Sequence, residues 1–232
     1  MGRRLKIATY NIHGWVDEEC RSNLDRVAEL VNLHDPDILC LQEVSSSPGS
    51  PCSPAQVYPC WEQPCLLEFL RKTGFEFSLR WEGCAILSKA GIVLQEHGAE
   101  DSHSLLPKAP GFDFNRPRYV TARVELEDCQ DFFITCIHLI PKYSELRHEE
   151  VVQISEDLRS LFSSGQPQVW LGDFNTLREA DYSQEEWRDI VSLRQKNGRK
   201  APLSDVTEEL DRLGFQDSWT LAGRPEPRTT SR

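Results

Sequence analysis

The chain has 232 residues, of which 39% are hydrophobic and 9% aromatic, so it is long enough to build a substantial core, and we expect one domain over residues 1–232. A net charge of −11 argues against a protein that holds nucleic acid through a broad basic face. The sequence has no run of ~18 apolar residues and no signal peptide, which excludes a membrane span by this criterion. We therefore expect an intracellular protein, cytoplasmic or nuclear.

The eight cysteines favour reduced thiols over a disulfide framework in a protein that is not secreted. Cys40, Cys84 and Cys136 lie inside apolar, strand-like runs, where cysteine acts as a small core residue. The closest group of cysteines, at positions 52, 60 and 65, lacks the paired short spacing of a zinc site and has no histidine nearby. A thiolate metal centre is therefore not expected.

The first predicted elements are a strand at 5–12, a helix that ends before Asp35-Pro36, and a buried strand at 37–44. Proline ends the helix because it lacks an amide hydrogen and restricts the residue before it. This order of strand, helix and strand begins an α/β layer. Residues 45–64 are rich in Ser, Pro and Gly, which predicts a mobile loop.

Beyond this loop, the pattern of apolar residues predicts helices at 66–72, 144–163, 184–194 and 204–213, and strands at 75–81, 84–88, 92–95, 119–126, 132–139 and 168–171. So many strands need two sheets. Helices before, between and after the strands favour two packed sheets with helices on the outer faces.

Polar residues follow four of the predicted strands at their C-terminal ends: Asn11, His13, Glu43, His138, Asp173 and Asn175. Ligands gather at such strand ends in α/β layers, because the loops there converge on a rigid sheet. Hard oxygen donors suit Mg²⁺ or Mn²⁺. Read alone, each residue also has a structural explanation, such as a turn at Asp173 or a hydrogen-bonded core histidine at position 138.

Five sequence blocks carry a specific resemblance: YNIHG at 10–14, DILCLQEV at 37–44, GCAILSK at 83–89, IHL at 137–139 and WLGDFN at 170–175. Their identity and order resemble the signature blocks of the endonuclease/exonuclease/phosphatase superfamily of DNase-like, Mg²⁺-dependent phosphoesterases. This resemblance implies an α/β fold, a four-layer α/β/β/α sandwich of two mixed sheets with outer helices. The active site is then expected at one end of the two sheets.

The same resemblance implies roles for five residues. Glu43 would hold the catalytic divalent metal ion, Mg²⁺ or Mn²⁺, with Asn11 beside it contacting metal or phosphate. His138 would contact the phosphate or donate a proton, and Asp173 would orient or activate the attacking water. Asn175 would bind the phosphoryl oxygens. These roles agree with the physical requirement for charge neutralisation and fixed donors around a reacting phosphate.

Arg116 and Arg118 precede the strand predicted at 119–126 and flank a proline. They are candidate phosphate contacts, because a guanidinium group matches phosphate oxygens in a bidentate manner. The alternative is that both arginines are solvated on a surface loop.

The sequence departs from the family pattern near its end. Members close with a strand block containing Asp-Tyr and then a Ser-Asp-His block, and neither block is found before Arg232. We therefore expect a C-terminally incomplete domain that lacks its last two strands and whose activity is reduced.

The function implied is divalent-metal-dependent hydrolysis of a phosphoester bond, by a phosphodiesterase, nuclease or phosphatase. The alternative is a non-catalytic phosphate-binding or partner-binding member of the same fold. The expected partner is a phosphoester substrate, either a nucleic acid, a phospholipid or an inositol phosphate, because a fold does not choose among substrates. We expect a monomer.

Overall fold

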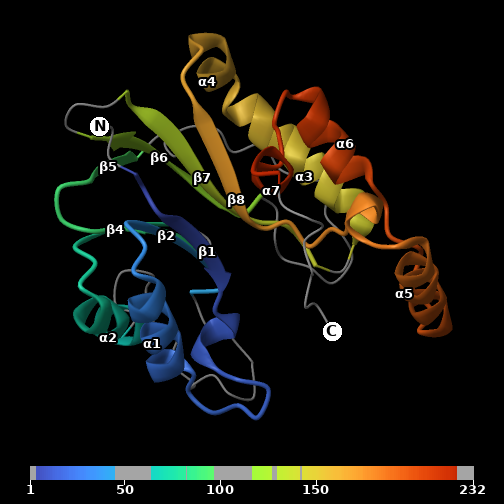
Figure 1. Ribbon diagram of the computed structural model, residues 1–232, viewed down its shortest axis with the longest axis horizontal. Coiled ribbons are helices and arrows are strands. Elements are labelled where there is room, and N and C mark those ends of the chain that lie inside the picture. The colour runs from blue at the N-terminus through green and yellow to red at the C-terminus, as the bar shows by residue number, and fades with distance from the viewer. Residues whose placement is uncertain are drawn as a thin grey trace. The chain divides into compact units, whose positions relative to one another are not determined.

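The computed structural model describes residues 4–44, 64–81, 83–96, 117–126, 130–141 and 143–223 (Figure 1). The chain divides into two compact units, one with Met1–His138 and Glu156–Asp173, the other with Leu139–Ser155 and Phe174–Arg232. The expectation of a single domain stays a prediction. The loop predicted at 45–64 lies outside the described residues except for Pro64, which is the first residue of helix α2.

The first sheet has the strand order β1-β2-β4-β3. Its strands are β1 (Ile7–Asn11), β2 (Ile38–Gln42), β3 (Phe77–Trp81) and β4 (Cys84–Ser88). β1 runs parallel to β2, and the register places Asn11 beside Gln42. β4 is antiparallel to both β2 and β3. Because β1 and β2 are parallel, the residues that follow them emerge at the same edge of the sheet.

The second sheet has the strand order β5-β6-β7-β8. Its strands are β5 (Val93–Glu96), β6 (Tyr119–Glu125), β7 (Phe132–His138) and β8 (Gln168–Asp173). β5, β6 and β7 are antiparallel neighbours, whereas β7 and β8 run parallel. The register of this parallel pair places His138 directly beside Asp173 at its C-terminal end.

The two sheets share an apolar core. Ile38, Cys40 and Ile86 from the first sheet belong to the same buried cluster as Val120 and Ile134 from the second. Side chains alternate between the two faces of a strand, so the intervening residues of β2 must point to the opposite face. Burial of both faces explains why β2 reads as a continuous apolar run.

Helices α1 (Leu24–His34) and α2 (Pro64–Thr73) cover the other face of the first sheet. Leu39 and Leu41 of β2 pack there in one buried cluster with Val27 of α1 and Phe69 of α2. Helix α1 ends at His34, and Asp35 adopts a left-handed conformation with φ 48° before the proline. The predicted effect of Asp35-Pro36 on this helix is therefore confirmed.

The long helix predicted at 144–163 is two helices, α3 (Ser144–Asp157) and α4 (Arg159–Ser164). Leu158, which is fully buried, separates them with non-helical dihedral angles. Within the first unit, the Phe162 ring of α4 lies edge-on to Trp170 of β8, with 5.9 Å between the ring centroids. An outer helix therefore packs on the second sheet as well.

The second unit is helical. Besides most of α3, it contains the short 3-10 helix η2 (Glu179–Asp181) and helices α5 (Gln184–Lys196), α6 (Asp205–Arg212) and α7 (Ser218–Leu221). Ser183 and Glu186 begin α5 with a reciprocal capping box, in which each side chain accepts a hydrogen bond from the other residue's backbone amide. Glu150 of α3 accepts a hydrogen bond of 2.7 Å from the backbone amide of Ile140.

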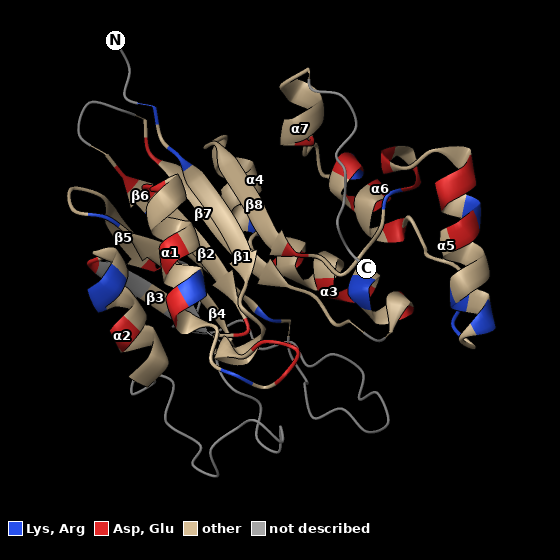
Figure 2. Ribbon diagram, turned by 60° about the horizontal axis from the view of Figure 1, so that its bottom comes forward, with Lys and Arg blue, Asp and Glu red and all other residues tan. Residues whose placement is uncertain are grey.

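The predicted α/β class with two mixed sheets and outer helices is confirmed. Figure 2 shows charged residues mainly on helices and loops, whereas the paired strands are mostly uncharged. None of the helices in the described segments has the length and apolar character that crossing a membrane requires. Cys40, Cys65, Cys84 and Cys136 are free thiols, as expected, but Cys20 takes part in a disulfide, so the expectation of reduced cysteines is wrong for this residue.

Candidate active site

Asn11 joins two carboxylates at the ends of the strands. Its side-chain nitrogen Nδ2 donates hydrogen bonds of 3.0 Å to Oε1 of Glu43 and 3.0 Å to Oδ2 of Asp173. Its oxygen Oδ1 accepts a hydrogen bond of 3.0 Å from the backbone amide of His13. The amide hydrogen of His13 fixes the orientation of the Asn11 side chain, because only the oxygen accepts hydrogen bonds.

His138 completes a group of four predicted site residues, all within the first unit. Its Nε2 lies 3.6 Å from Oε1 of Glu43, which is close but longer than a hydrogen bond. Asn11 and Glu43 come from the edge of the first sheet, whereas His138 and Asp173 come from the second. The strand ends of the two sheets therefore meet at a common site. We call Asn11, Glu43, His138 and Asp173 the polar cluster.

Two residues in and beside the polar cluster have backbone conformations that residues other than glycine rarely adopt. Glu43 has φ 58° and His13 has φ 54°. Such residues cost about 1–3 kcal/mol each and persist where the surrounding structure holds them, which is frequent at functional sites. The turn after β2 aims Glu43 at Asn11, and Val44 continues the chain with a backbone hydrogen bond to Gly83.

His138 is held as a neutral imidazole. Its side chain is 3% exposed, and burial lowers its pKa below the ordinary histidine value. The positive charge of Arg118 lowers this pKa further, while the carboxylates of Glu43 and Asp173 oppose the shift. At neutral pH the His138 ring therefore serves as a hydrogen-bonding group and not as a cation.

Both carboxylate oxygens of Glu43 have neighbours: Oε1 accepts a hydrogen bond from Asn11 and lies near His138, and Oε2 faces His13. Its side chain is 32% exposed, and Oε2 lies 3.5 Å from Nδ1 of His13, which is itself 70% exposed. Sequence reasoning noticed His13 after the first strand but gave it no role. The short 3-10 helix η1 (His13–Trp15) places it beside Glu43.

The oxygen donors of this cluster fit a divalent cation of the Mg²⁺ type, which prefers carboxylates and retains several water ligands. In the described part of the chain, no group of three or more His, Cys, Asp or Glu residues is placed to hold a metal ion. A bound ion would therefore take few ligands from the protein. Water and substrate would fill its remaining positions.

The other predicted site residues lie as follows. Asn175 belongs to the second unit, and its Nδ2 donates a hydrogen bond of 2.8 Å to the backbone oxygen of Leu139 in the same unit. Arg116 lies outside the described residues. Arg118 precedes β6, its backbone oxygen accepts a hydrogen bond of 2.9 Å from the His138 amide, and its charge acts on His138.

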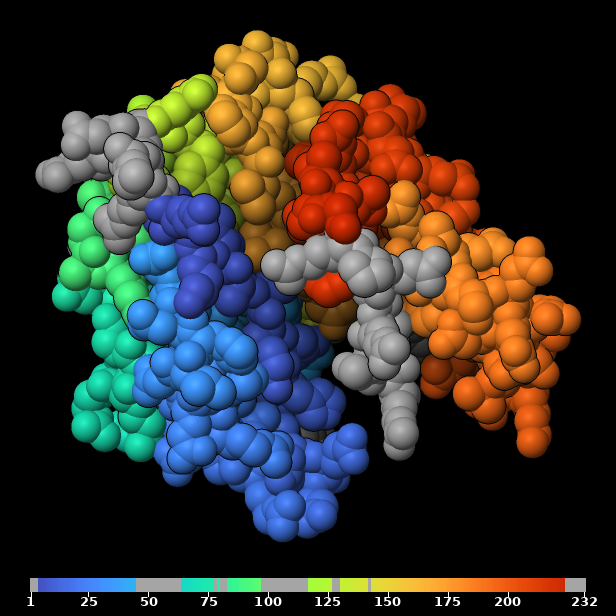
Figure 3. Space-filling model, in the orientation of Figure 1, coloured from blue at the N-terminus to red at the C-terminus, as the bar shows by residue number. Residues whose placement is uncertain are grey.

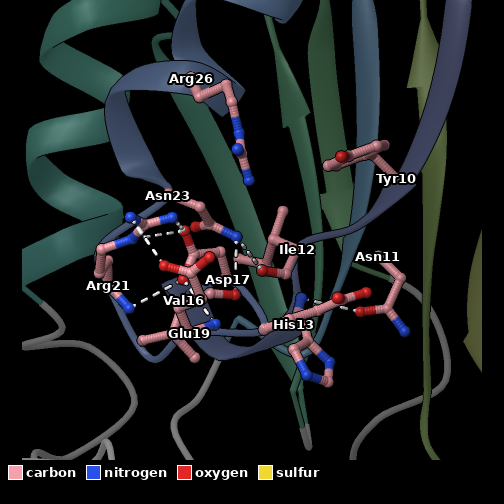
Figure 4. A pocket seen from close by; sticks show the side chains of 11 residues that line it. Tyr10, Asn11, Ile12, His13, Val16, Asp17, Glu19, Arg21, Asn23 and Arg26 are labelled. Carbon is pink, nitrogen blue, oxygen red and sulfur yellow. Dashed lines mark hydrogen bonds and ion pairs between the residues drawn. The ribbon is translucent and has the colours of Figure 1, made fainter.

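A pocket of about 470 Å³ opens beside the polar cluster (Figure 4). It is lined by Asn11, which belongs to the cluster, and by His13, which lies beside Glu43. Its other lining residues come from β1 and the residue after it, from the segment between η1 and α1, and from the first turn of α1: Tyr10, Ile12, Val16, Asp17, Glu18, Glu19, Arg21, Asn23 and Arg26. This N-terminal segment reaches the surface on the face shown in Figure 3. Sequence reasoning included Tyr10 in the YNIHG block without giving it a role, and it did not single out Arg26.

The fold and the polar cluster together define a DNase-like α/β protein with a candidate site at the strand ends of two packed mixed sheets. Residues 8–230 match the model of the Endonuclease/Exonuclease/phosphatase family. The chain therefore belongs to this family, whose members are typically phosphoester hydrolases.

The chain is also similar to one curated protein and to solved structures. Protein angel of Drosophila melanogaster is 30% identical over 167 residues, which are 69% of this chain and 44% of that protein. The chain thus spans less than half the length of this curated relative. Among solved structures, the human Nocturnin catalytic domain with bound sulfate anion has a TM-score of 0.50 at 19% identity, over 81% of this chain and 69% of that one.

A mannosyl-6-phosphatase of Bacteroides thetaiotaomicron has a TM-score of 0.54 at 17% identity, over 75% of this chain and 67% of that chain. At these identities, the Nocturnin domain and this phosphatase show that the chain shares their fold, and they show nothing about a shared substrate.

Proposed function

We propose that the protein hydrolyses a phosphoester bond with the help of a divalent metal ion, Mg²⁺ or Mn²⁺. The observation that carries the proposal is the bridge from the Asn11 amide to both Glu43 and Asp173. A structural core has no need for two carboxylates on one amide, because like charges in proximity are costly. A cation and a phosphate at this position would offset that cost.

The metal ion, when bound, supplies polarisation of a phosphate oxygen and neutralisation of charge in the transition state. Glu43 is the proposed ligand, because its carboxylate is partly exposed at the strand ends. Asn11 is proposed beside the metal. In the described arrangement its nitrogen faces Glu43 and its oxygen binds the His13 amide, so Asn11 orients the Glu43 carboxylate.

The remaining residues of the polar cluster act on water and phosphate. Asp173 accepts a hydrogen bond from Asn11 with Oδ2 and is the proposed group that orients or activates the attacking water. His138, as a neutral imidazole, donates an N–H to a phosphate oxygen. Arg118 is proposed as a further phosphate contact, because its charge already acts on His138.

The proposed substrate is a phosphoester found in a nucleic acid, a phospholipid or an inositol phosphate, and the proposed setting is an intracellular monomer. The free thiols at Cys40, Cys84 and Cys136 are compatible with a reducing compartment. A disulfide at Cys20 is more typical of an oxidising one, so a thiol titration of freshly isolated protein would test this part of the proposal.

The test of the proposed activity is hydrolysis of bis-p-nitrophenyl phosphate and p-nitrophenyl phosphate at increasing Mg²⁺ and after removal of metal with a chelator. We expect metal-dependent release of p-nitrophenol, strongly reduced in Glu43→Gln. Glu29→Gln, at an exposed position of α1, removes the same charge outside the polar cluster and should keep full activity. Phosphate binding without turnover in the unmodified protein would favour the non-catalytic alternative.

Metal binding gives a prediction that does not depend on turnover. Mg²⁺ should bind weakly to the free protein, and Glu43→Gln should reduce the affinity by more than the ~10–100-fold that loss of an outer-shell partner costs. Isothermal titration calorimetry of both proteins measures this difference. Equal affinities would remove Glu43 from the ligand role.

Although Glu43→Gln should weaken metal binding, it should increase the thermal stability of the metal-free protein. Glu43→Gln removes the repulsion between two carboxylates that share the Asn11 amide, while the glutamine oxygen still accepts the hydrogen bond. We expect the melting temperature of the metal-free variant to rise by roughly 1–3 °C. Differential scanning calorimetry in chelator measures it, and a fall in melting temperature would show that the two carboxylates do not repel each other in the folded state.

A further inference from the structure

One wall of the pocket beside the polar cluster contains two acidic side chains that are already paired with an arginine. Arg21 donates to Oδ2 of Asp17 through Nε at 3.2 Å and through one terminal nitrogen at 3.1 Å. Its other terminal nitrogen lies 2.8 Å from Oε2 of Glu19. One arginine thus holds both acidic side chains and offsets one of their two negative charges, so neither carboxylate is available to pair with Arg26.

The opposite side of the pocket carries two hydrogen-bond donors without described partners. Arg26 is exposed on α1. Its guanidinium group makes no ion pair with a carboxylate and no hydrogen bond to a backbone oxygen in the described segments. Tyr10 is 41% exposed at the end of β1, and its hydroxyl has no described partner either. Figure 4 shows the Arg26 guanidinium and the Tyr10 hydroxyl pointing into the pocket from different sides.

An anion satisfies both donors. A guanidinium group pairs with phosphate oxygens in a bidentate manner, and a phenolic hydroxyl donates readily to the same oxygens. The chain as a whole has a net charge of −11. In a chain with this excess of carboxylates, the cation Arg26, which has no described ion-pair partner, is therefore unusual. Glu18 is the remaining acidic side chain of the lining, and no described basic residue pairs with it.

We infer that this pocket binds a second phosphate group of the substrate through Arg26 and Tyr10. The inference rests on the proposed function, in which the reacting phosphate lies at the polar cluster. Asn11 and His13 line the pocket and also belong to or contact the polar cluster, so one molecule reaches both places. A volume of about 470 Å³ accommodates a sugar ring with its phosphate and exceeds the need of a single phosphate. The preferred substrates are therefore bisphosphorylated compounds.

The test compares ligands that differ by one phosphate group. Fructose 1,6-bisphosphate and fructose 6-phosphate form one pair, and inositol 1,4-bisphosphate and inositol 1-phosphate form a second pair with different spacing. Binding is measured by calorimetry in Mg²⁺ buffer, and ligand integrity is checked by chromatography after each titration. In at least one pair, the bisphosphate should bind about tenfold more tightly than the monophosphate.

Variants then locate the second phosphate. Arg26→Gln should remove most of the tenfold factor and leave monophosphate affinity unchanged, and Tyr10→Phe should reduce the factor partly. Glu18→Gln should tighten bisphosphate binding by about two- to threefold, because a like charge is removed. This increase cannot arise from a damaged fold. Arg188→Gln on α5, which removes the same charge from an exposed position outside the pocket, is the matched control.

Equal binding of both members in both pairs, or a preference for bisphosphate that persists in Arg26→Gln, would overturn the inference. The same holds if neither ligand of either pair binds. Hydrolysis of the chromogenic esters is measured separately, so absence of a bisphosphate preference in the unmodified protein, together with intact hydrolysis, rejects the pocket alone. Intact preference without hydrolysis rejects the catalytic proposal alone.

Discussion

Replacement of Asp173 by asparagine is expected to reduce turnover by about 10²–10⁴-fold, the range that a positioned general acid or base contributes. Asparagine keeps the size of the side chain and an oxygen that accepts the hydrogen bond from Asn11. It removes the negative charge and the basic oxygen that would orient or take a proton from water. The loss should therefore fall on kcat, measured with a chromogenic phosphodiester at saturating Mg²⁺.

The matched control is Asp25→Asn. Asp25 lies on α1 with an 80% exposed side chain and pairs with Lys72 at 3.0 Å, so its loss removes the same charge from the surface. This variant should keep kcat within about twofold, because exposed ion pairs contribute only ~0–1 kcal/mol. If Asp173→Asn retains the kcat of the control while its melting temperature is unchanged, Asp173 has no part in the chemical step.

Much of the fold could be predicted from sequence because both faces of the inner strands leave a clear signal. In β2, Ile38 and Cys40 pack in one buried cluster and Leu39 and Leu41 in the other. The break between α3 and α4 could not be predicted, because Leu158 at the break is buried and continues the apolar pattern of a longer helix. The spacing of apolar residues in the sequence indicates which side chains are buried, but it does not indicate the backbone dihedral angles.

The candidate site could be predicted in part. Strand-end placement and the family resemblance together predicted that Asn11, Glu43, His138 and Asp173 share a site, and parallel pairing within each sheet places their strand ends at one edge. The orientation of the Asn11 amide could not be foreseen, because it depends on a backbone amide in the turn at His13. The roles of all these residues stay proposals.

Nothing in the sequence indicated that Tyr10 and Arg26 face a common pocket, although Tyr10 belongs to the YNIHG block at 10–14. Tyr10 and Arg26 are single polar residues on an amphipathic strand and helix, where exposed side chains are ordinary. Their common position arises from the turn that joins β1 to α1. In that turn Asn23 holds the backbone oxygens of Ile12 and Val16 with hydrogen bonds of 3.0 Å each.

Among the described glycines with known surroundings, Gly172 is the position where an added methyl group meets the closest atoms. It lies in β8 opposite Ile137 with φ +144°, and a Cβ atom there would stand 1.9 Å from the backbone oxygen of Ile137. Backbone atoms of a central strand cannot move aside as a flexible side chain does. Gly172→Ala is therefore expected to lower the free energy of unfolding by at least about 3 kcal/mol, the sum of an overpacked contact and a strained conformation.

Gly165→Ala separates these two effects. Gly165 ends α4 with φ +68°, and a Cβ atom there would meet no heavy atom within 4 Å. Only the conformational strain remains, so the expected loss is about 1 kcal/mol. Urea unfolding of both variants, followed by tryptophan fluorescence, measures the difference.

Gly172→Ala should also lose activity, because Ile137 and Gly172 immediately precede His138 and Asp173. Any separation of β7 from β8 therefore moves both of these side chains of the polar cluster. Equal stability losses in the two variants would mean that β7 and β8 are not paired in the register described.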